Sequence, residues 1–98
     1  MFRTILGSVL AFSALAAVPV AQAGDPIRIG EINSYKALPA FLEPYKMGMD
    51  LAVDEINASG GVIGRPLELI TRDDSATPGD AVRVAQALVT RERVDVLA

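Results

Sequence analysis

Apolar and polar positions along residues 24–98 follow two alternating periods, one typical of strands and one typical of helices. Residues 27–32 are short and β-branched and follow Pro26, so they predict a strand. Residues 45–56 repeat at helical spacing, with Pro44 in the first helical turn, where a missing N–H costs nothing. The expected apolar stripe is Tyr45, Gly48, Met49, Ala52, Val53 and Ile56, and the expected polar face is Lys46, Asp50, Asp54 and Asn57.

The pattern then repeats. Gly60 and Gly61 end the first helix, residues 64–66 form a turn, and residues 67–71 predict a second strand. A second helix begins with Thr77 as N-cap and Pro78 as its first residue, with Asp80 in its first turn. Residues 94–98 predict a third strand. The expected apolar stripe of the second helix is Ala81, Val82, Ala85, Leu88 and Val89.

This β-α-β-α-β order predicts an α/β fold with an open parallel sheet and right-handed crossovers. If the first strand lies between the second and the third, the two helices fall on opposite faces. The third predicted strand is apolar, and the chain stops there. We therefore expect residues 24–98 to be the N-terminal portion of a longer α/β chain; the alternative is a small domain that stands alone or pairs as a dimer.

The first 23 residues predict a secretory signal peptide. Arg3 supplies a short positive region, residues 5–18 are mostly apolar, and Ala21-Gln22-Ala23 offers the small-x-small cleavage pattern. The alternative, a membrane anchor, needs about 20 apolar residues, and this run is shorter. No Cys is available near the cleavage point for lipid attachment. The pattern indicates a free protein in a periplasm.

Composition excludes several classes of function. The chain has no His and no Cys, which removes zinc fingers, Cys nucleophiles, Ser-His-Asp triads and His metal sites. Its formal net charge is −3, with no stripe of Lys and Arg, so nucleic acid is not expected as a partner. No cofactor and no metal are expected.

Two short motifs have both a chemical and a structural interpretation. The glycines at 60, 61 and 64 resemble a phosphate loop, but they close a helix and precede a strand, which favours a turn. Asp73 and Asp74 follow the second strand, on the side of an open sheet where ligands bind. They either contact a ligand in its cleft or hold the turn before Thr77 by hydrogen bonds.

The connection after the first strand is the richest candidate site. As predicted it runs over residues 33–43, longer than the usual connection of about 2–6 residues. It carries an amide, a hydroxyl and two aromatic rings, which suit a small polar ligand with an apolar body. The alternative is that the rings pack the loop onto the sheet. With the acid after the second strand, the candidate ligand-binding residues are Asn33, Ser34, Tyr35, Phe41 and Asp73.

Three motifs occur together between residues 52 and 74: A-V-D-E-I-N-x-x-G-G, the turn G-R-P-L, and D-D after the next strand. With Pro78 and residues 85–89, this combination resembles the N-terminal lobe of the leucine/isoleucine/valine-binding family of periplasmic solute-binding proteins. The resemblance implies the type I periplasmic-binding-protein fold, in which two lobes joined by a hinge trap a solute between them. In the family's pattern an aromatic residue seven places before the helix glycine can line the cleft; counted back from Gly48, it is Phe41.

The resemblance implies a receptor that binds an amino acid, an amide or a related small solute and delivers it to the membrane subunits of an ABC permease. Such a protein is not an enzyme, and we expect a monomer at full length. Two alternatives stay open: a ligand-sensing module of the same fold that feeds a signalling partner, and an exported α/β enzyme. In the family, the groups that hold an amino-acid headgroup follow the third and fourth strands, so none is assigned here.

The signal peptide leads to a first prediction, that the mature protein begins at Gly24. Cleavage after Ala23 follows from the small residues at 21 and 23 and from the short apolar run before them. N-terminal sequencing of the full-length protein from a periplasmic fraction should read Gly24-Asp25-Pro26. Recovery of an intact Met1 would contradict it.

Overall fold

The structure, a computed structural model, describes residues 24–98, and the predicted signal peptide lies outside them. The elements occur in the predicted order. The strands are β1 (Ile27–Asn33), β2 (Leu67–Asp73) and β3 (Val96–Leu97), and the helices are α1 (Pro39–Ala58) and α2 (Pro78–Thr90). Within residues 24–98 neither helix combines the length and the apolar character that crossing a membrane requires.

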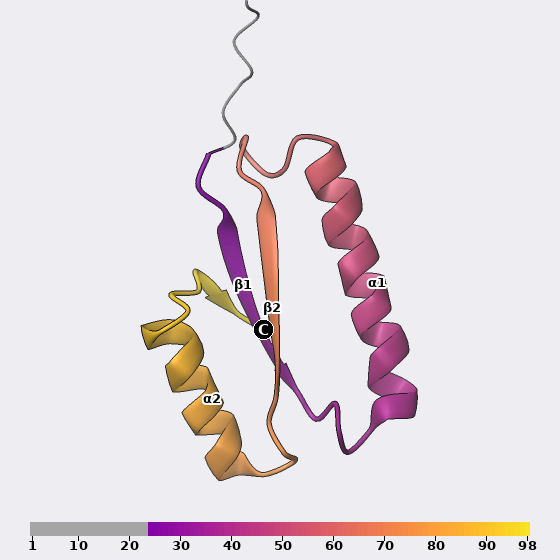
Figure 1. The fold of residues 1–98 in the computed structure, drawn as a ribbon, viewed down its shortest axis with the longest axis vertical. Helices are drawn as coiled ribbons and strands as arrows, with labels where there is room; N and C mark the ends of the chain where they lie inside the picture. The colour runs from indigo at the N-terminus through magenta and orange to yellow at the C-terminus, as the bar shows by residue number, and fades with distance from the viewer. Residues whose placement is uncertain (1–23) are drawn as a thin grey trace, which may run out of the picture.

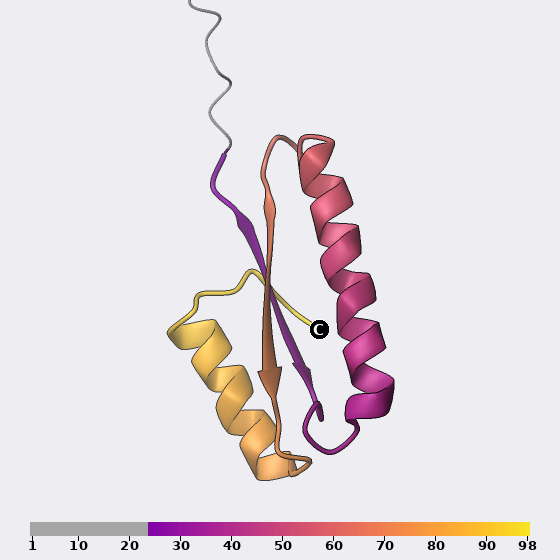
Figure 2. The same cartoon turned by 45° about the vertical axis from the view of Figure 1, so that its right-hand side comes forward.

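The three strands form one parallel sheet in the order β2-β1-β3, which confirms the predicted topology. In the register of β1 and β2, Ile27 lies opposite Leu67 and Asn33 lies opposite Asp73. The two helices lie on opposite sides of the sheet (Figures 1 and 2). The carboxyl ends of β1 and β2 therefore lie side by side, together with loops 34–38 and 74–77. We call this region the carboxyl edge.

The short third strand is held more firmly than its length suggests. Asp95 donates its backbone N–H to the Arg28 carbonyl (2.8 Å), and its carboxylate accepts from the Arg28 N–H (2.9 Å). Ala98 extends the pairing, because its N–H donates to the Gly30 carbonyl at 2.7 Å. The strand predicted over 94–98 is thus correct in place but shorter, at Val96–Leu97, and Val94 instead donates its N–H to the carbonyl of Leu88 at the end of α2 (3.1 Å).

The first helix begins earlier than the sequence predicts. Pro39 is its first residue and Leu38 its N-cap, so Pro44 lies inside the helix. The expected loop over residues 33–43 is therefore wrong, since the connection covers only residues 34–38. Both prolines fit a first helical turn locally, but starting at Pro39 lets Leu42 pack under the helix at 3% exposure. Pro44 has no N–H, so the Ala40 carbonyl lacks its helical hydrogen bond. Ala40 is exposed, so this carbonyl is not buried without a partner.

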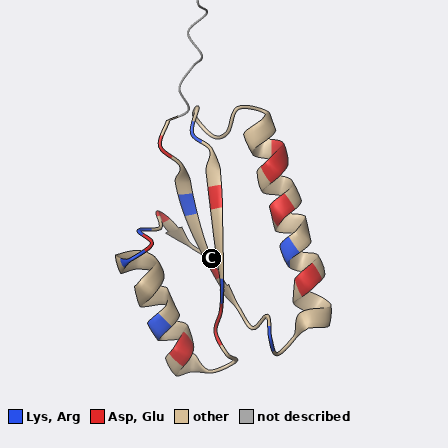
Figure 3. Cartoon of the chain, in the orientation of Figure 1, with Lys and Arg blue, Asp and Glu red and all other residues tan. Residues whose placement is uncertain are grey.

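Asn57 was expected on the polar face of α1 and instead faces β2. Its amide nitrogen donates to the Leu67 carbonyl (2.9 Å), and its amide oxygen accepts from the Leu67 N–H (2.7 Å). The side chain thus pairs with the first residue of β2 as a neighbouring strand would. Lys46 and Asp50 do lie on the exposed face, where they form an ion pair at 2.8 Å. Acidic and basic residues lie along both helices (Figure 3).

The turn between α1 and β2 depends on Gly61, as the turn interpretation of the glycine motif predicts. Gly61 has a φ of +78°, and a Cβ there would lie 2.1 Å from the Arg65 carbonyl oxygen. Its N–H donates to the Ile56 carbonyl at 2.9 Å, which closes the helix. Only glycine fits this approach.

The second helix begins as predicted and faces the sheet slightly differently. Thr77 is the N-cap and Pro78 the first helical residue, although the Thr77 side chain makes no capping hydrogen bond. Leu88 is buried at 1% exposure. Val82 and Val89 of the expected stripe are 60% and 50% exposed, while Val84 is half-buried. Because α2 packs mainly against β1 and β2, this contact buries fewer of its apolar residues than the predicted stripe contains.

Substitution Asn57→Ala should destabilise the full-length protein by about 1–3 kcal/mol, because it leaves both backbone groups of Leu67 without their partner. Thermal and denaturant unfolding would measure the loss. Gln86→Ala, which removes an exposed amide on α2, is the matched control and should change the stability little. Equal stability of the two variants would show that the contact with Leu67 contributes nothing.

Candidate functional site

The two loops of the carboxyl edge are joined by hydrogen bonds. The Ser34 hydroxyl donates to the Asp74 carboxylate at 2.7 Å, and the Lys36 backbone N–H donates to the Asp73 carboxylate at 2.9 Å. The Asp74 N–H also donates to the Asn33 carbonyl at 3.1 Å. Residues some 40 positions apart in the chain thus form one connected surface at the ends of β1 and β2.

Each of the two acids also shapes its own loop. A second oxygen of Asp73 accepts from the Ser75 N–H (2.9 Å), and the Asp74 carboxylate accepts from the Ala76 N–H (2.8 Å). Ser75 and Ala76 have φ values of 56° and 53°, in the left-handed region that non-glycine residues seldom adopt. The carboxylates therefore hold a strained turn. Backbone donation from Lys36, more than any other contact, lowers the pKa of Asp73 below its ordinary value.

A buried acid lies directly behind this surface. Glu31 in β1 is only 2% exposed. Its carboxyl oxygens accept a short hydrogen bond from the Tyr35 hydroxyl and a longer one from the Asn33 side-chain amide, at 3.3 Å. Burial raises the pKa of Tyr35 above its usual range, and the hydrogen bond to Glu31 and that residue's negative charge raise it further. No role for Glu31 was predicted from the sequence, although an acid within a mostly apolar inner strand is the signal that would have found it.

The structure brings together four of the five candidate residues. Asn33, Ser34, Tyr35 and Asp73 belong to the connected hydrogen bonds of the carboxyl edge. Phe41 is separate from them, because it lies in the first turn of α1 with 74% of its surface exposed. Contact of these residues with a solute remains a prediction.

A small cavity of about 270 Å³ lies at the carboxyl edge. It is lined by Ser34, Asp74, Ala76, Thr77, Pro78 and Ala81. Ligand pockets typically reach about 300–1,000 Å³, so this cavity is of the size of a partial site. Among residues 24–98 no group of three acidic, His or Cys side chains is placed to hold a metal ion.

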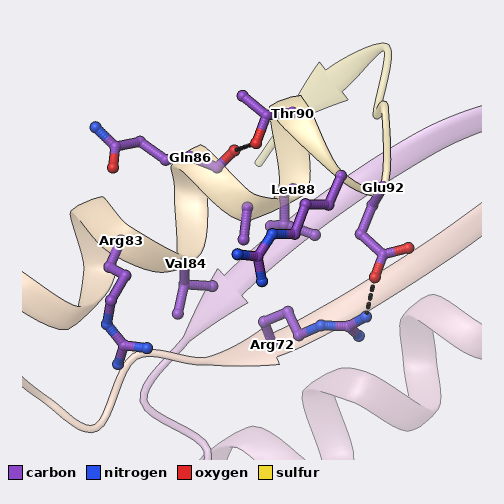
Figure 4. Close-up of a pocket in the computed structure, with 9 residues that line it drawn as sticks. Arg72, Arg83, Val84, Gln86, Leu88, Thr90 and Glu92 are labelled. Carbon is purple, nitrogen blue, oxygen red and sulfur yellow. Dashed lines mark hydrogen bonds and ion pairs between the residues drawn. The ribbon is translucent and has the colours of Figure 1, made fainter.

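A larger cavity of about 550 Å³ lies along α2, facing β2 (Figure 4). Two of the arginines that line it are engaged by acids: Arg72 pairs with Glu92 at 3.0 Å, and Arg83 pairs with Asp80 at 2.7 Å. Exposed ion pairs of this kind contribute little, about 0–1 kcal/mol each. With these two cations paired, the carboxyl edge is the better candidate site.

A parallel sheet that gathers its polar loops at the carboxyl ends of neighbouring strands is the architecture of an α/β ligand-binding lobe. The sequence matches the periplasmic binding protein family over residues 26–98. The chain belongs to this family, as the motifs of the N-terminal lobe indicated.

Curated relatives carry names of the same kind. An amino acid binding protein of Pseudomonas aeruginosa is 39% identical over 54 residues, which cover 55% of this chain. A Leu/Ile/Val-binding protein homolog 2 of Brucella abortus is 42% identical over 50 residues, or 51% of this chain. The matched part of each relative is 14% of its length.

Solved structures agree on the fold. The branched-chain amino acid transporter substrate-binding protein LivJ of Streptococcus pneumoniae, solved with isoleucine, superposes with a TM-score of 0.66 at 34% identity, covering 74% of this chain and 21% of LivJ. A putative branched-chain amino acid ABC transporter protein of Silicibacter pomeroyi gives 0.65 at 32%, covering 74% and 19%. The type I periplasmic-binding-protein fold is thereby confirmed for this part of the lobe.

The Asp73 contacts lead to a pH-dependent prediction for the full-length protein. Because the folded state lowers the pKa of Asp73, its ionised form stabilises the fold above the ordinary Asp value of about 3.9, and this contribution is lost as the pH falls through the lowered value. Asp73→Asn should therefore lower the Tm at pH 7, and the difference from wild type should shrink towards pH 3.

Thermal unfolding between pH 7 and pH 3 measures this difference. Asp54→Asn, on the exposed face of α1, is the control and should change the Tm little at either pH. A deficit of Asp73→Asn that stays constant with pH would contradict a role for the ionised carboxylate.

Proposed function

We propose that this chain forms part of one lobe of an extracytoplasmic receptor that captures a small polar solute and delivers it to an ABC permease. The observation that carries the proposal is the order β2-β1-β3 in a chain of this family. In this order the switch point of the sheet lies between β1 and β3, so loop 34–38, which follows β1, borders it. Ligands of open α/β sheets bind outside the carboxyl ends at such a switch point.

The names of the relatives and the residues of the candidate site support a solute class. Relatives are named for binding amino acids or leucine, isoleucine and valine, and LivJ was solved with isoleucine. We propose an amino acid, an amide or a related small compound. On this lobe the contacts would come from the five candidate residues, with Phe41 supplying an exposed ring beside the polar edge.

The proposed activity is binding and release without chemistry. The relatives include two proteins named as substrate-binding proteins of transporters, one of them an ABC transporter. Export through the signal peptide would place the receptor in the periplasm, with the solute and the permease as its partners. We propose that the full-length protein is a monomer and uses no cofactor.

Calorimetry on the purified full-length protein tests the proposal, after a thermal-shift screen with the common amino acids and their amides. We expect one of these compounds to raise the Tm and bind with one-to-one stoichiometry, and uptake of that compound to fall when the gene is deleted. If binding is found but deletion leaves uptake unchanged, the sensing alternative replaces transport. No binding by any compound, with turnover of one of them, would favour the enzyme.

Phe41→Ala should weaken solute binding by about 5- to 150-fold, because burying such a ring against a ligand contributes roughly 1–3 kcal/mol. Calorimetry with the compound from the screen measures the change. Leu51→Ala is the matched control, since Leu51 is also exposed on α1 (59%) but lies more than two turns further from the carboxyl edge. Binding by Phe41→Ala within twofold of wild type would remove Phe41 from the site.

A further inference from the structure

Glu31 stands out because it is a buried acid whose hydrogen-bond partners are neutral side chains. Most of β1 is apolar or small, and Glu31, at 2% exposure, is the one buried acid among residues 24–98. Burying a carboxyl group is costly unless hydrogen bonds satisfy it. Its partners are not cations: they are the phenol of Tyr35 and the side-chain amide of Asn33.

Both partners belong to the candidate site. Asn33 is the last residue of β1, and Tyr35 is the second residue of loop 34–38. Each turns a polar group back towards Glu31. The other end of the Asn33 amide is also engaged, because its oxygen accepts from the Ser34 N–H at 3.0 Å. In this arrangement Asn33 and Tyr35 each direct a polar group inward, away from the surface of the edge.

We propose that Glu31 is a positioning residue, whose buried carboxyl group fixes loop 34–38 in the shape that presents the solute-facing side of this lobe. That a solute binds here rests on the proposed function. The role of Glu31 in the shape of the loop rests on its hydrogen bonds alone. Tyr35 then contacts the solute through its ring, because Glu31 holds its hydroxyl. Loop 34–38 therefore selects the solute by shape and apolar contact more than by hydrogen bonds from Asn33 and Tyr35.

The loop is then held from two sides. From within, Glu31 holds Tyr35 and Asn33; from the neighbouring loop, Asp73 and Asp74 hold the Lys36 N–H and the Ser34 hydroxyl. The Lys36 contact is exposed and the Ser34 contact is part-buried, whereas Glu31, the acceptor of the inner contact, is only 2% exposed. A shielded hydrogen bond is stronger than an exposed one, so the inner contact should dominate the order of the loop.

The test compares Glu31→Leu, Glu31→Gln and Tyr35→Phe in the full-length protein. Glu31→Leu removes both acceptors at similar volume, Glu31→Gln keeps one acceptor oxygen, and Tyr35→Phe keeps the ring but removes the donor. Glu43→Leu, on the exposed surface of α1, is the matched control for loss of an acid. Two readouts are used: hydrogen exchange of the amides of residues 34–38, and the Kd of the solute found by screening.

We expect Glu31→Leu to speed exchange in residues 34–38 and to raise the Kd, each by about tenfold, with Tyr35→Phe showing a similar but smaller effect. Glu31→Gln should stay within about threefold of wild type, and Glu43→Leu should be unchanged. The double variant Glu31→Leu/Tyr35→Phe should be no worse than Glu31→Leu, because both act through one contact.

Two results would overturn the proposal: unchanged loop exchange in a folded Glu31→Leu protein, or faster exchange with an unchanged Kd. If Glu31→Leu does not fold, Tyr35→Phe decides by the same two measurements. The exchange measurement needs no solute, so failure of the receptor function would show as absent binding by wild type. Failure of the positioning role would show in the loop itself.

Discussion

The central place of β1 is the constraint on which the rest of the structure depends. With β2 on one side and β3 on the other, β1 pairs along both edges. Right-handed crossovers then place α1 and α2 on opposite faces, and their loops meet at one end of the sheet. A residue without a side chain is favoured at position 30 of β1, because a Cβ there would lie 3.0 Å from Val94 and 3.2 Å from Leu88 of α2. The candidate site lies at the carboxyl end of this central strand, where loop 34–38 meets the loop that follows β2.

The parts of the fold that depend on local signals were predictable, and those that depend on a distant partner were not. Thr77 and Pro78 start α2 as predicted, because Pro78 is preorganised for the first helical position. Pro39 and Pro44 offered two equivalent starts for α1, and the burial of Leu42 decides between them. Asn57 was misplaced for the same reason: hydrophobic periodicity identifies an apolar face, but it cannot show that a strand end at Leu67 needs hydrogen-bond partners.

The same distinction between local signals and distant partners applies to the candidate site. Its position was predictable, since ligands of parallel sheets lie at the carboxyl ends of the strands. Its internal bonding was predictable only in part: hydrogen bonds of Asp73 and Asp74 within the turn before Thr77 were one of two expectations, and both form. The donation from the Lys36 N–H to Asp73 was not predicted, because no side-chain pattern indicates a backbone donor from a distant loop. Glu31 was overlooked because a strand is recognised by its apolar majority. The one acid in that mostly apolar strand is the residue that indicates a polar contact behind the loop.

The bridge between loops 34–38 and 74–77 has a thermodynamic consequence for any molecule that binds there. Fixing the backbone of one residue costs roughly 1–2 kcal/mol in conformational entropy. Ser34 and Lys36 are already bonded to Asp74 and Asp73, so this cost falls on folding and not on association. A preorganised surface retains more of its contact energy as affinity. A molecule that binds here would therefore spend less of its contact energy on ordering loops 34–38 and 74–77.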